Sequence, residues 1–240
     1  GTTWDIQTPL PVLTSFVEAI IDNVILTGGV ESMSRGPFVM AKAETAFSRE
    51  MRIFDSAVGA RFPNPRIEKE FGNDTMPQTA DNLAAEYGLS RQEVDQFAAE
   101  SQSKYAKALA DSYFADEIYS VSVPGKKKGE LIEISSDEQP RGDTTLESLA
   151  AMRTLNPNGV TTAASSSSIN DGAVALIVGN AESAGLIGLK PIAKILSSAV
   201  VGVPPRIMGI GPVPASLKAL ERAGLTLKGM DVIEINEAFS

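Results

Sequence analysis

The chain has 240 residues, a formal net charge of −9, and neither cysteine nor histidine. This composition excludes disulfides, thiolate metal sites and any mechanism in which the chain alone supplies a Cys–His or Ser–His pair. The acidic charge argues against nucleic acid as a partner, and no apolar run is long enough to predict a membrane span or a signal peptide. We therefore expect a cytoplasmic globular protein.

The first predicted element is a short apolar run at 24–30, VILTGGV, which ends near two glycines. This pattern predicts a buried parallel strand followed by a tight turn. Residues 34–80 show no clear period, since prolines and charges interrupt them, so we expect an irregular segment there. Five phenylalanines in that segment argue against disorder.

Helical patterns follow. Residues 81–87 are expected to form a short helix that ends at Gly88. The clearest helix covers 90–109, because Ser90 and Glu93 make a capping-box pattern before an apolar stripe with helical spacing. Two alternating segments, 119–123 and 131–134, are separated by a glycine- and lysine-rich turn and predict a β-hairpin.

From residue 170 strand-like and helix-like segments alternate with short links, which favours a layered α/β structure. The expected strands are 173–178, 191–201 and 231–235, and the expected helices are 181–188 and 214–223, the last closed by Gly224. The segment 40–165 then resembles an insertion between two α/β pieces. Because the chain opens on Gly1 and stops just after an apolar strand-like run, we expect a partial chain.

Several motifs allow two interpretations. The hydroxyl-rich segment 165–172 could let a ligand approach the backbone, but composition alone favours a flexible turn. The lysines at 126–128 could meet a phosphate, although a solvated hairpin tip is the simpler interpretation. Residues 208–212 favour a plain loop before a helix. For 236–239, at the exit of the last expected strand, a functional site and a strand-end cap are equally supported.

Four blocks together resemble the thiolase family of acyl-CoA acyltransferases. They are GGVESMS at 28–34, NDGA at 170–173, MGIGPVPA at 208–215 and NEAF at 236–239. Each block is modest alone, but their order and spacing match the family from about residue 19 onward. The segments 37–49, 61–65 and 76–80 further resemble thiolases that act on 3-oxoadipyl-CoA.

The resemblance implies an α/β fold, a partial thiolase-like αβαβα layered arrangement with an inserted α+β loop domain. Residues 1–39 would end the N-terminal thiolase half, 40–165 would be the loop domain that covers coenzyme A, and 166–240 would open the C-terminal half. It also implies a homodimer or homotetramer, an acyl-CoA substrate, coenzyme A as co-substrate, and no metal, nucleic acid or membrane partner.

The implied reaction is ping-pong thiolysis, in which a cysteine thiolate takes the acyl group and a second coenzyme A removes it. The family's two cysteines and histidine are absent from this chain, so the chain alone is expected to be inactive. The resemblance assigns Asn236 to the water of an oxyanion hole. It assigns contacts with coenzyme A or the acyl group to Arg141, Ser148, Ala163, Ser167, Met208, Ala238, Phe239 and Met76.

Three functions follow from these observations. The leading one is part of a thiolase that cleaves a 3-oxoacyl-CoA, with 3-oxoadipyl-CoA as the expected substrate, to acetyl-CoA and a shortened acyl-CoA. The second is a catalytically inactive chain that only binds coenzyme A esters. The third is a truncated structural fragment. The absence of cysteine and histidine keeps the second and third open.

Overall fold

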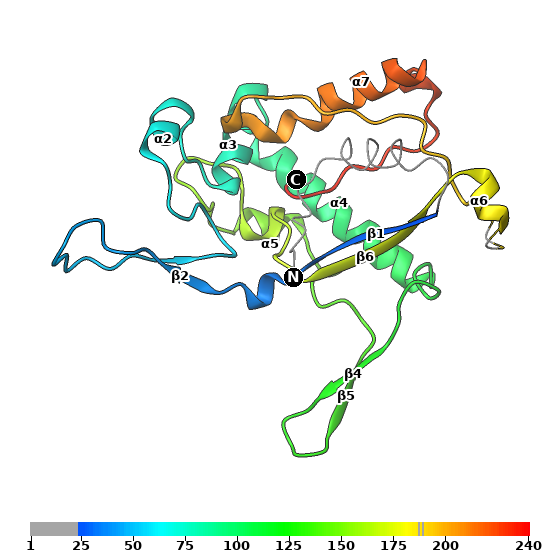
Figure 1. Cartoon of the computed structure of the whole chain (residues 1–240), viewed down its shortest axis with the longest axis horizontal. Coiled ribbons are helices and arrows are strands. Elements are labelled where there is room, and N and C mark those ends of the chain that lie inside the picture. The colour runs from blue at the N-terminus through cyan, green and yellow to red at the C-terminus, as the bar shows by residue number, and fades with distance from the viewer. Residues whose placement is uncertain (1–23, 187, 189) are drawn as a thin grey trace. The chain divides into compact units, whose positions relative to one another are not determined.

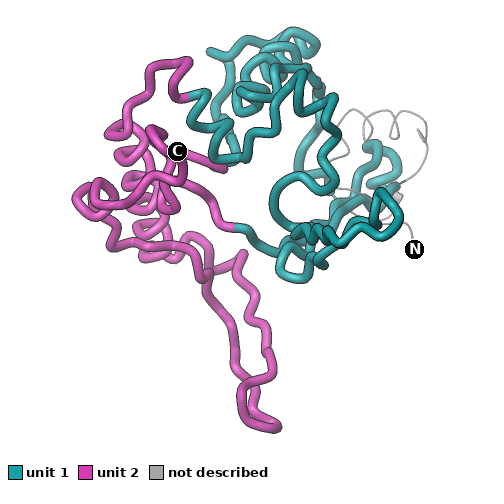
Figure 2. Tube along the Cα trace, turned by 90° about the vertical axis from the view of Figure 1, so that its left-hand side faces the viewer, with its two compact units in different colours: residues 1–83, 169–236 teal, residues 84–168, 237–240 magenta. Residues whose placement is uncertain are grey.

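The computed structural model describes residues 24–186, 188 and 190–240. The chain divides into two compact units, coloured separately in Figure 2. Unit 1 comprises residues 1–83 and 169–236, and unit 2 comprises residues 84–168 and 237–240. Each unit is described by itself. The predicted division into 1–39, 40–165 and 166–240 follows different boundaries and stays a prediction.

One sheet of unit 1 pairs β1 (Ile25–Glu31) with β6 (Gly172–Val178). The two strands run side by side in Figure 1 and are antiparallel, with Gly28 opposite Ala175. Both strands were expected from their apolar runs and are confirmed. The expected parallel direction is wrong, because the two strands join through an antiparallel ladder that spans both of them from end to end.

The glycine pair inside β1 has a different role from the expected turn. A Cβ atom on Gly28 would stand 2.3 Å from the carbonyl oxygen of Val174 on the neighbouring strand. The strand continues through both glycines to Glu31, so the chain does not turn there, and Gly28 allows close approach of the neighbouring strand.

The segment expected to be irregular contains four short elements. They are the 3₁₀ turn η1 (Met33–Arg35), the antiparallel strands β2 (Phe38–Met40) and β3 (Ile53–Asp55), and helix α2 (Pro65–Phe71). Strands of three residues are too short to show a period, which is why the sequence pattern missed them. Helix α2 did carry a start signal, because Asn64 caps the backbone N–H of Arg66 at 2.9 Å and Pro65 opens the helix.

Helix α3 (Met76–Tyr87) ends where expected, at Gly88 with a left-handed φ of 68°, but begins five residues earlier than predicted. The remaining elements of unit 1 are α6 (Ala181–Leu186), η3 (Pro205–Ile210), α7 (Pro212–Ala223) and η4 (Leu227–Gly229). Helix α7 ends at Gly224 as predicted.

The strands expected at 191–201 and 231–235 are wrong. Among the described residues neither segment joins a ladder, and a strand exists only where a neighbour satisfies its backbone groups. The apolar side chains of Ile192 and Val232 are almost wholly exposed. The apolar residues of these two segments led us to expect buried strands, but the described structure leaves Ile192 and Val232 exposed.

Unit 2 is built on the long helix α4 (Arg91–Ala110), with α5 (Leu146–Ala150) and the 3₁₀ turn η2 (Ala163–Ser165) packed against it. The predicted capping box is confirmed, since Ser90 and Glu93 bond each other's backbone N–H groups. The predicted hairpin is also confirmed as β4 (Val121–Pro124) paired with β5 (Leu131–Ile134).

The core of unit 2 is small and includes a charged pair. Val94 and Ala98 on α4 and Leu149 on α5 are buried, and Leu149 is 1% exposed. The buried carboxylate of Asp95 accepts hydrogen bonds from Arg91 at 2.8 and 2.9 Å, and Arg91 also donates to the carbonyl of Leu149. The ion pair thus joins α4 to α5 as well as neutralising the buried charge.

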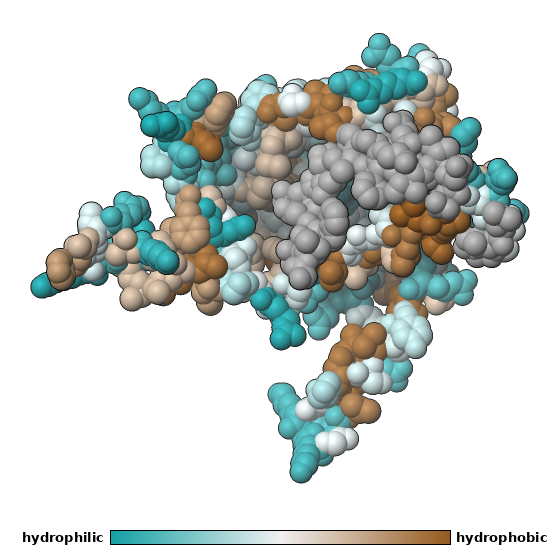
Figure 3. Space-filling view, in the orientation of Figure 1, coloured by the Kyte–Doolittle hydropathy of each residue, from teal (hydrophilic) through white to brown (hydrophobic). Residues whose placement is uncertain are grey.

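The hairpin extends away from this core, and Figure 3 shows apolar side chains along its strands and hydrophilic ones at its tip. The tip contains Lys126, Lys127 and Lys128. Within the described part of the chain, no helix is both long and apolar enough to cross a membrane.

Candidate functional site

The end of the chain pairs with the hydroxyl-rich loop inside unit 2. The backbone N–H of Ser167 donates to the carbonyl of Ala238 at 2.9 Å, and that of Ser240 donates to the carbonyl of Ser165 at 2.9 Å. Phe239 lies opposite Ser166 in an isolated β-bridge. Three predicted site residues, Ser167, Ala238 and Phe239, are thereby brought together.

The loop before this pairing is held by its own hydroxyl groups. Thr162 is fully buried and makes a capping box with Ser165, and the hydroxyl of Ser166 donates to the carbonyl of Thr162 at 2.7 Å. These bonds stiffen the turn that carries Ala163, which is exposed. The flexible turn favoured by composition is therefore an ordered one, and its backbone is hydrogen-bonded to residues 238–240.

Glu237 anchors the same segment to helix α4. Its carboxylate accepts a hydrogen bond of 2.6 Å from the hydroxyl of Ser101. Sequence reasoning noted Glu237 only as part of a motif and did not single out Ser101. The one available signal was the polar Ser101 within the apolar stripe of α4, which is the face that packs inward.

Arg141 and Ser148 lie on or just before α5, also in unit 2. The guanidinium group of Arg141 donates to the carbonyls of residues 138, 139 and 140 at 2.6–3.1 Å, which folds it onto its own loop. Ser148 forms a capping box with Thr145 at the start of α5. Both residues are exposed, and the link between Arg91 and α5 fixes the element that presents Ser148.

The other predicted residues, Met76, Met208 and Asn236, belong to unit 1. Met76 opens α3 and Met208 lies in η3, with exposed fractions of 50% and 44%. Asn236 is exposed at the end of the apolar run 231–235.

A polar cluster joins the two elements that carry the methionines. The carboxylate of Asp74 accepts hydrogen bonds from Arg206 at 2.9 Å and from Asn82 at 2.7 Å. The amide of Asn82 also donates to the carbonyl of Arg206 at 3.0 Å. The bond from Arg206, followed by that from Asn82, lowers the pKa of Asp74 from its ordinary 3.8, so the carboxylate is charged at neutral pH.

Two of the motif blocks meet in unit 1. Ser34 donates to the carboxylate of Asp171 twice, from its backbone at 2.9 Å and from its hydroxyl at 2.6 Å. These bonds, the hydroxyl first, hold the pKa of Asp171 below its usual value. The block at 28–34 and the block at 170–173 therefore serve as one structural joint at the end of the β1–β6 ladder.

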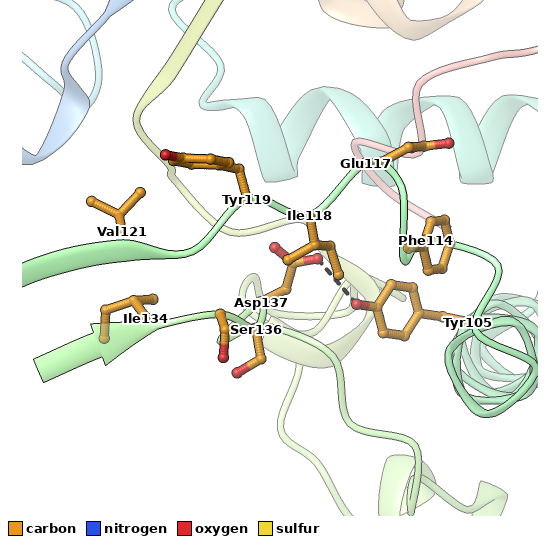
Figure 4. A pocket seen from close by; sticks show the side chains of 10 residues that line it. Tyr105, Phe114, Glu117, Ile118, Tyr119, Val121, Ile134, Ser136 and Asp137 are labelled. Carbon is orange, nitrogen blue, oxygen red and sulfur yellow. Dashed lines mark hydrogen bonds between the residues drawn. The ribbon is translucent and has the colours of Figure 1, made fainter.

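A separate pocket of about 490 Å³ lies in unit 2 beside the base of the hairpin. Figure 4 shows Tyr105, whose hydroxyl donates to Asp137 at 3.0 Å, facing the opening with Phe114 and Ile118 near it. Burial, more than this bond, raises the pKa of Tyr105. No predicted site residue lines the pocket. In the part of the chain that the structure describes, no acidic cluster could hold a metal ion.

Family models match nearly the whole chain. The N-terminal domain of thiolase matches residues 16–182, and the C-terminal domain of thiolase matches residues 189–240. The chain belongs to the thiolase family. The blocks that carried the resemblance are thus explained by descent.

Curated relatives narrow the comparison. The chain is 50% identical over 219 residues to the beta-ketoadipyl-CoA thiolase of Acinetobacter baylyi, covering 91% of this chain and 54% of that protein. It is 49% identical to the 3-oxoadipyl-CoA/3-oxo-5,6-dehydrosuberyl-CoA thiolase of Escherichia coli, with the same coverage. It is 43% identical to an acetyl-CoA acetyltransferase of Pseudomonas aeruginosa. The chain spans about half the length of these relatives.

Solved structures of thiolases share the fold of this chain. The acetyl-CoA acetyltransferase of Bacillus anthracis superposes with a TM-score of 0.82 at 32% identity, over 96% of this thiolase chain and 57% of that one. Human mitochondrial 3-ketoacyl-CoA thiolase gives a TM-score of 0.81 at 33% identity, over 95% and 57%. The expected thiolase-like α/β fold is confirmed, in a partial chain.

Proposed function

We propose that this chain provides the acyl-CoA-binding part of a thiolase that cleaves 3-oxoadipyl-CoA with coenzyme A. The sequence likeness to beta-ketoadipyl-CoA thiolases supports the substrate. The observation that carries the proposal is the pairing of residues 165–167 with 238–240. It sets Ser167, assigned to the pantetheine arm, beside Ala238 and Phe239, assigned to the acyl group.

The remaining roles follow the family resemblance. Asn236 would hold a water in the oxyanion hole, where it stabilises the negative charge that develops on the thioester oxygen. Arg141 and Ser148 would contact coenzyme A from the loop domain 40–165, with Ala163 along the pantetheine. Met208, Ala238 and Phe239 would line the acyl pocket, with Met76 near it. The assembly would be a homodimer or homotetramer, and coenzyme A would serve as co-substrate without a metal.

The reaction requires a nucleophile that this chain does not contain. In thiolysis a thiolate attacks the 3-oxo carbon and the bond between C2 and C3 breaks, and C2 keeps the electron pair and takes a proton from an enzyme acid, so that acetyl-CoA leaves. The sulfur of a second coenzyme A then takes the acyl group from the enzyme. The absence of cysteine and histidine therefore predicts no turnover by the 240 residues alone, and it favours binding without catalysis as the second candidate function.

A chimera tests the proposal. Residues 24–240 would replace their counterparts in the Acinetobacter baylyi beta-ketoadipyl-CoA thiolase, which supplies the rest of a thiolase at 50% identity. We expect the chimera to cleave 3-oxoadipyl-CoA with a higher kcat/KM than acetoacetyl-CoA. The unmodified bacterial enzyme is the matched control. A folded chimera that cleaves neither substrate would contradict the proposal.

Calorimetry with the 240-residue chain separates the alternatives. We expect adipyl-CoA to bind weakly or not at all, because the predicted contacts lie in two units and many apolar side chains remain exposed. Micromolar affinity would instead favour the chain that only binds coenzyme A esters. A chain that shows no binding and yields an inactive chimera would be a structural fragment.

A further inference from the structure

Arg206 is a cation that is linked to both segments carrying the methionines of the acyl-group prediction. It lies two residues before Met208 in η3, and it bonds Asp74, which lies two residues before Met76. Met208 belongs to the proposed acyl pocket, and Met76 is proposed to lie near it. The segments that hold them are also in close contact, since a Cβ on Gly209 would stand 3.3 Å from the side chain of Leu83.

Hydrogen bonds orient the guanidinium group of Arg206 but leave some of its N–H donors available to a ligand. Its Nε donates to Asp74 at 2.9 Å, and one Nη group reaches the side-chain oxygen of Asn82 only at a long 3.5 Å. The other Nη group has no hydrogen-bond partner within the described ranges of the chain. The side chain of Arg206 is 63% exposed, whereas that of Asp74 is 22% exposed. A guanidinium held through Nε presents its two Nη groups as a fork that fits one carboxylate.

We propose that Arg206 recognises the distal carboxylate of a dicarboxylic acyl-CoA, and that Asp74 and Asn82 orient it for that contact. The inference rests on the proposed function, because 3-oxoadipyl-CoA ends in a carboxylate where 3-oxohexanoyl-CoA ends in a methyl group. Asp74 and Asn82 are positioning residues, since they act through Arg206. A lysine would supply the charge without the planar fork.

The chimera provides the first test. Arg206→Gln is expected to lower kcat/KM for 3-oxoadipyl-CoA about 10- to 100-fold, mainly through KM, because one charged hydrogen-bonded contact is lost. The value for 3-oxohexanoyl-CoA is expected to stay within about twofold. For Arg206→Lys, the loss in kcat/KM for 3-oxoadipyl-CoA should be smaller than for Arg206→Gln. The control variant Arg66→Gln removes an exposed arginine from α2 and should leave kcat/KM for both substrates unchanged. Equal losses for both substrates, or no loss, would overturn the proposal.

A second measurement does not depend on turnover. It uses the folded chimera, in which carbon-13 labelling of the methionine methyl groups reports on the seven methionines that this chain contributes. The adipyl thioester of N-acetylcysteamine is expected to shift the methyl signals of Met76 and Met208, and the hexanoyl thioester is not. Both probes lack the phosphates of coenzyme A, so an arginine that binds phosphate instead would respond only to coenzyme A itself.

The two measurements separate the two proposals. An inactive chimera with adipyl-specific shifts that disappear in Arg206→Gln would contradict the thiolase function but support carboxylate recognition. An active chimera whose substrate preference ignores Arg206 would support the function and overturn this inference. Absence of shifts, or equal shifts from both thioesters, would also overturn it.

Discussion

The α4–α5–η2 core of unit 2 and the β1–β6 ladder of unit 1 differ in how far they bury their apolar side chains. In unit 2, α4 buries Val94 and Ala98 while α5 buries Leu149. In the ladder, Leu26, Val174 and Leu176 are each more than half exposed. The first is held by side-chain packing and a buried ion pair, and the second by backbone hydrogen bonds.

This difference separates the two sources of structure in the chain. A helix with an apolar stripe and a cap forms its own small core when a short partner helix covers it. A two-stranded ladder fixes register but leaves both faces open, and two strands alone are marginally stable in water. Substitutions in the two regions should therefore have very different effects.

The largest expected effect is at Leu149. Leu149→Ala removes a side chain that is 1% exposed and should destabilise the chain by about 2–4 kcal/mol, because it leaves a cavity between α4 and α5. The matched change in the ladder, Leu176→Ala, should cost less than about 1 kcal/mol. Urea unfolding followed by circular dichroism measures both. Similar costs at the two positions would remove the contrast between the regions.

The next effect concerns the buried ion pair. Arg91→Ala leaves the Asp95 carboxylate buried without its partner and also removes the bonds to the carbonyls of Leu149 and Met152. We expect a loss of about 2–3 kcal/mol. Hydrogen exchange of the α4 amides should accelerate while that of β1 is unchanged. Equal acceleration in both would show that the two regions unfold together.

A smaller effect is expected at the helix cap. Ser90→Ala removes the side-chain bond to the backbone of Glu93 and should cost about 1 kcal/mol. Ser103→Ala, an exposed change in the middle of the same helix, is the control and should be neutral or slightly stabilising, because alanine is the better helix former. The comparison is made by thermal unfolding. A cost at Ser103 that matched the cost at Ser90 would rule out a specific cap.

The smallest effect concerns Asp74. Its lowered pKa means that the folded state favours the charged carboxylate, so its contribution is present at neutral pH. That contribution declines as pH falls below the ordinary 3.8 and through the lowered folded-state pKa. Asp74→Asn should cost less than about 1 kcal/mol at neutral pH, because Arg206 is mostly exposed. At the lowest pH at which the chain stays folded, the cost should shrink; a cost that grew would contradict the assignment.

Local signals in the sequence predicted the regions that local interactions hold. Ser90, Gly88 and Gly224 set helix ends by their own chemistry, and all three ends are confirmed. The direction of β1 was wrong because strand pairing depends on a partner about 150 residues away, which a local run cannot indicate. The strands at 191–201 and 231–235 failed for the same reason.

The residues of the candidate site also fall into those that the sequence predicted and those that it did not. The family resemblance picked out Ser167, Ala238 and Phe239, and the structure brings them together through backbone bonds. Ser101 and Arg206 were missed, because their importance comes from partners at positions 237 and 74, respectively. Side chains that act across such separations show no periodic pattern. Contacts with coenzyme A stay predictions.

The central claim is that residues 24–240 provide the acyl-CoA-binding part and one supporting catalytic group of a thiolase. The most direct measurement is kcat for 3-oxoadipyl-CoA in the chimera, with Asn236 intact and with Asn236→Ala. The account predicts measurable turnover that falls about 10²- to 10³-fold in the variant, because an oxyanion-hole contact is lost. A folded chimera with no turnover, or one whose kcat does not respond to Asn236→Ala, would contradict it.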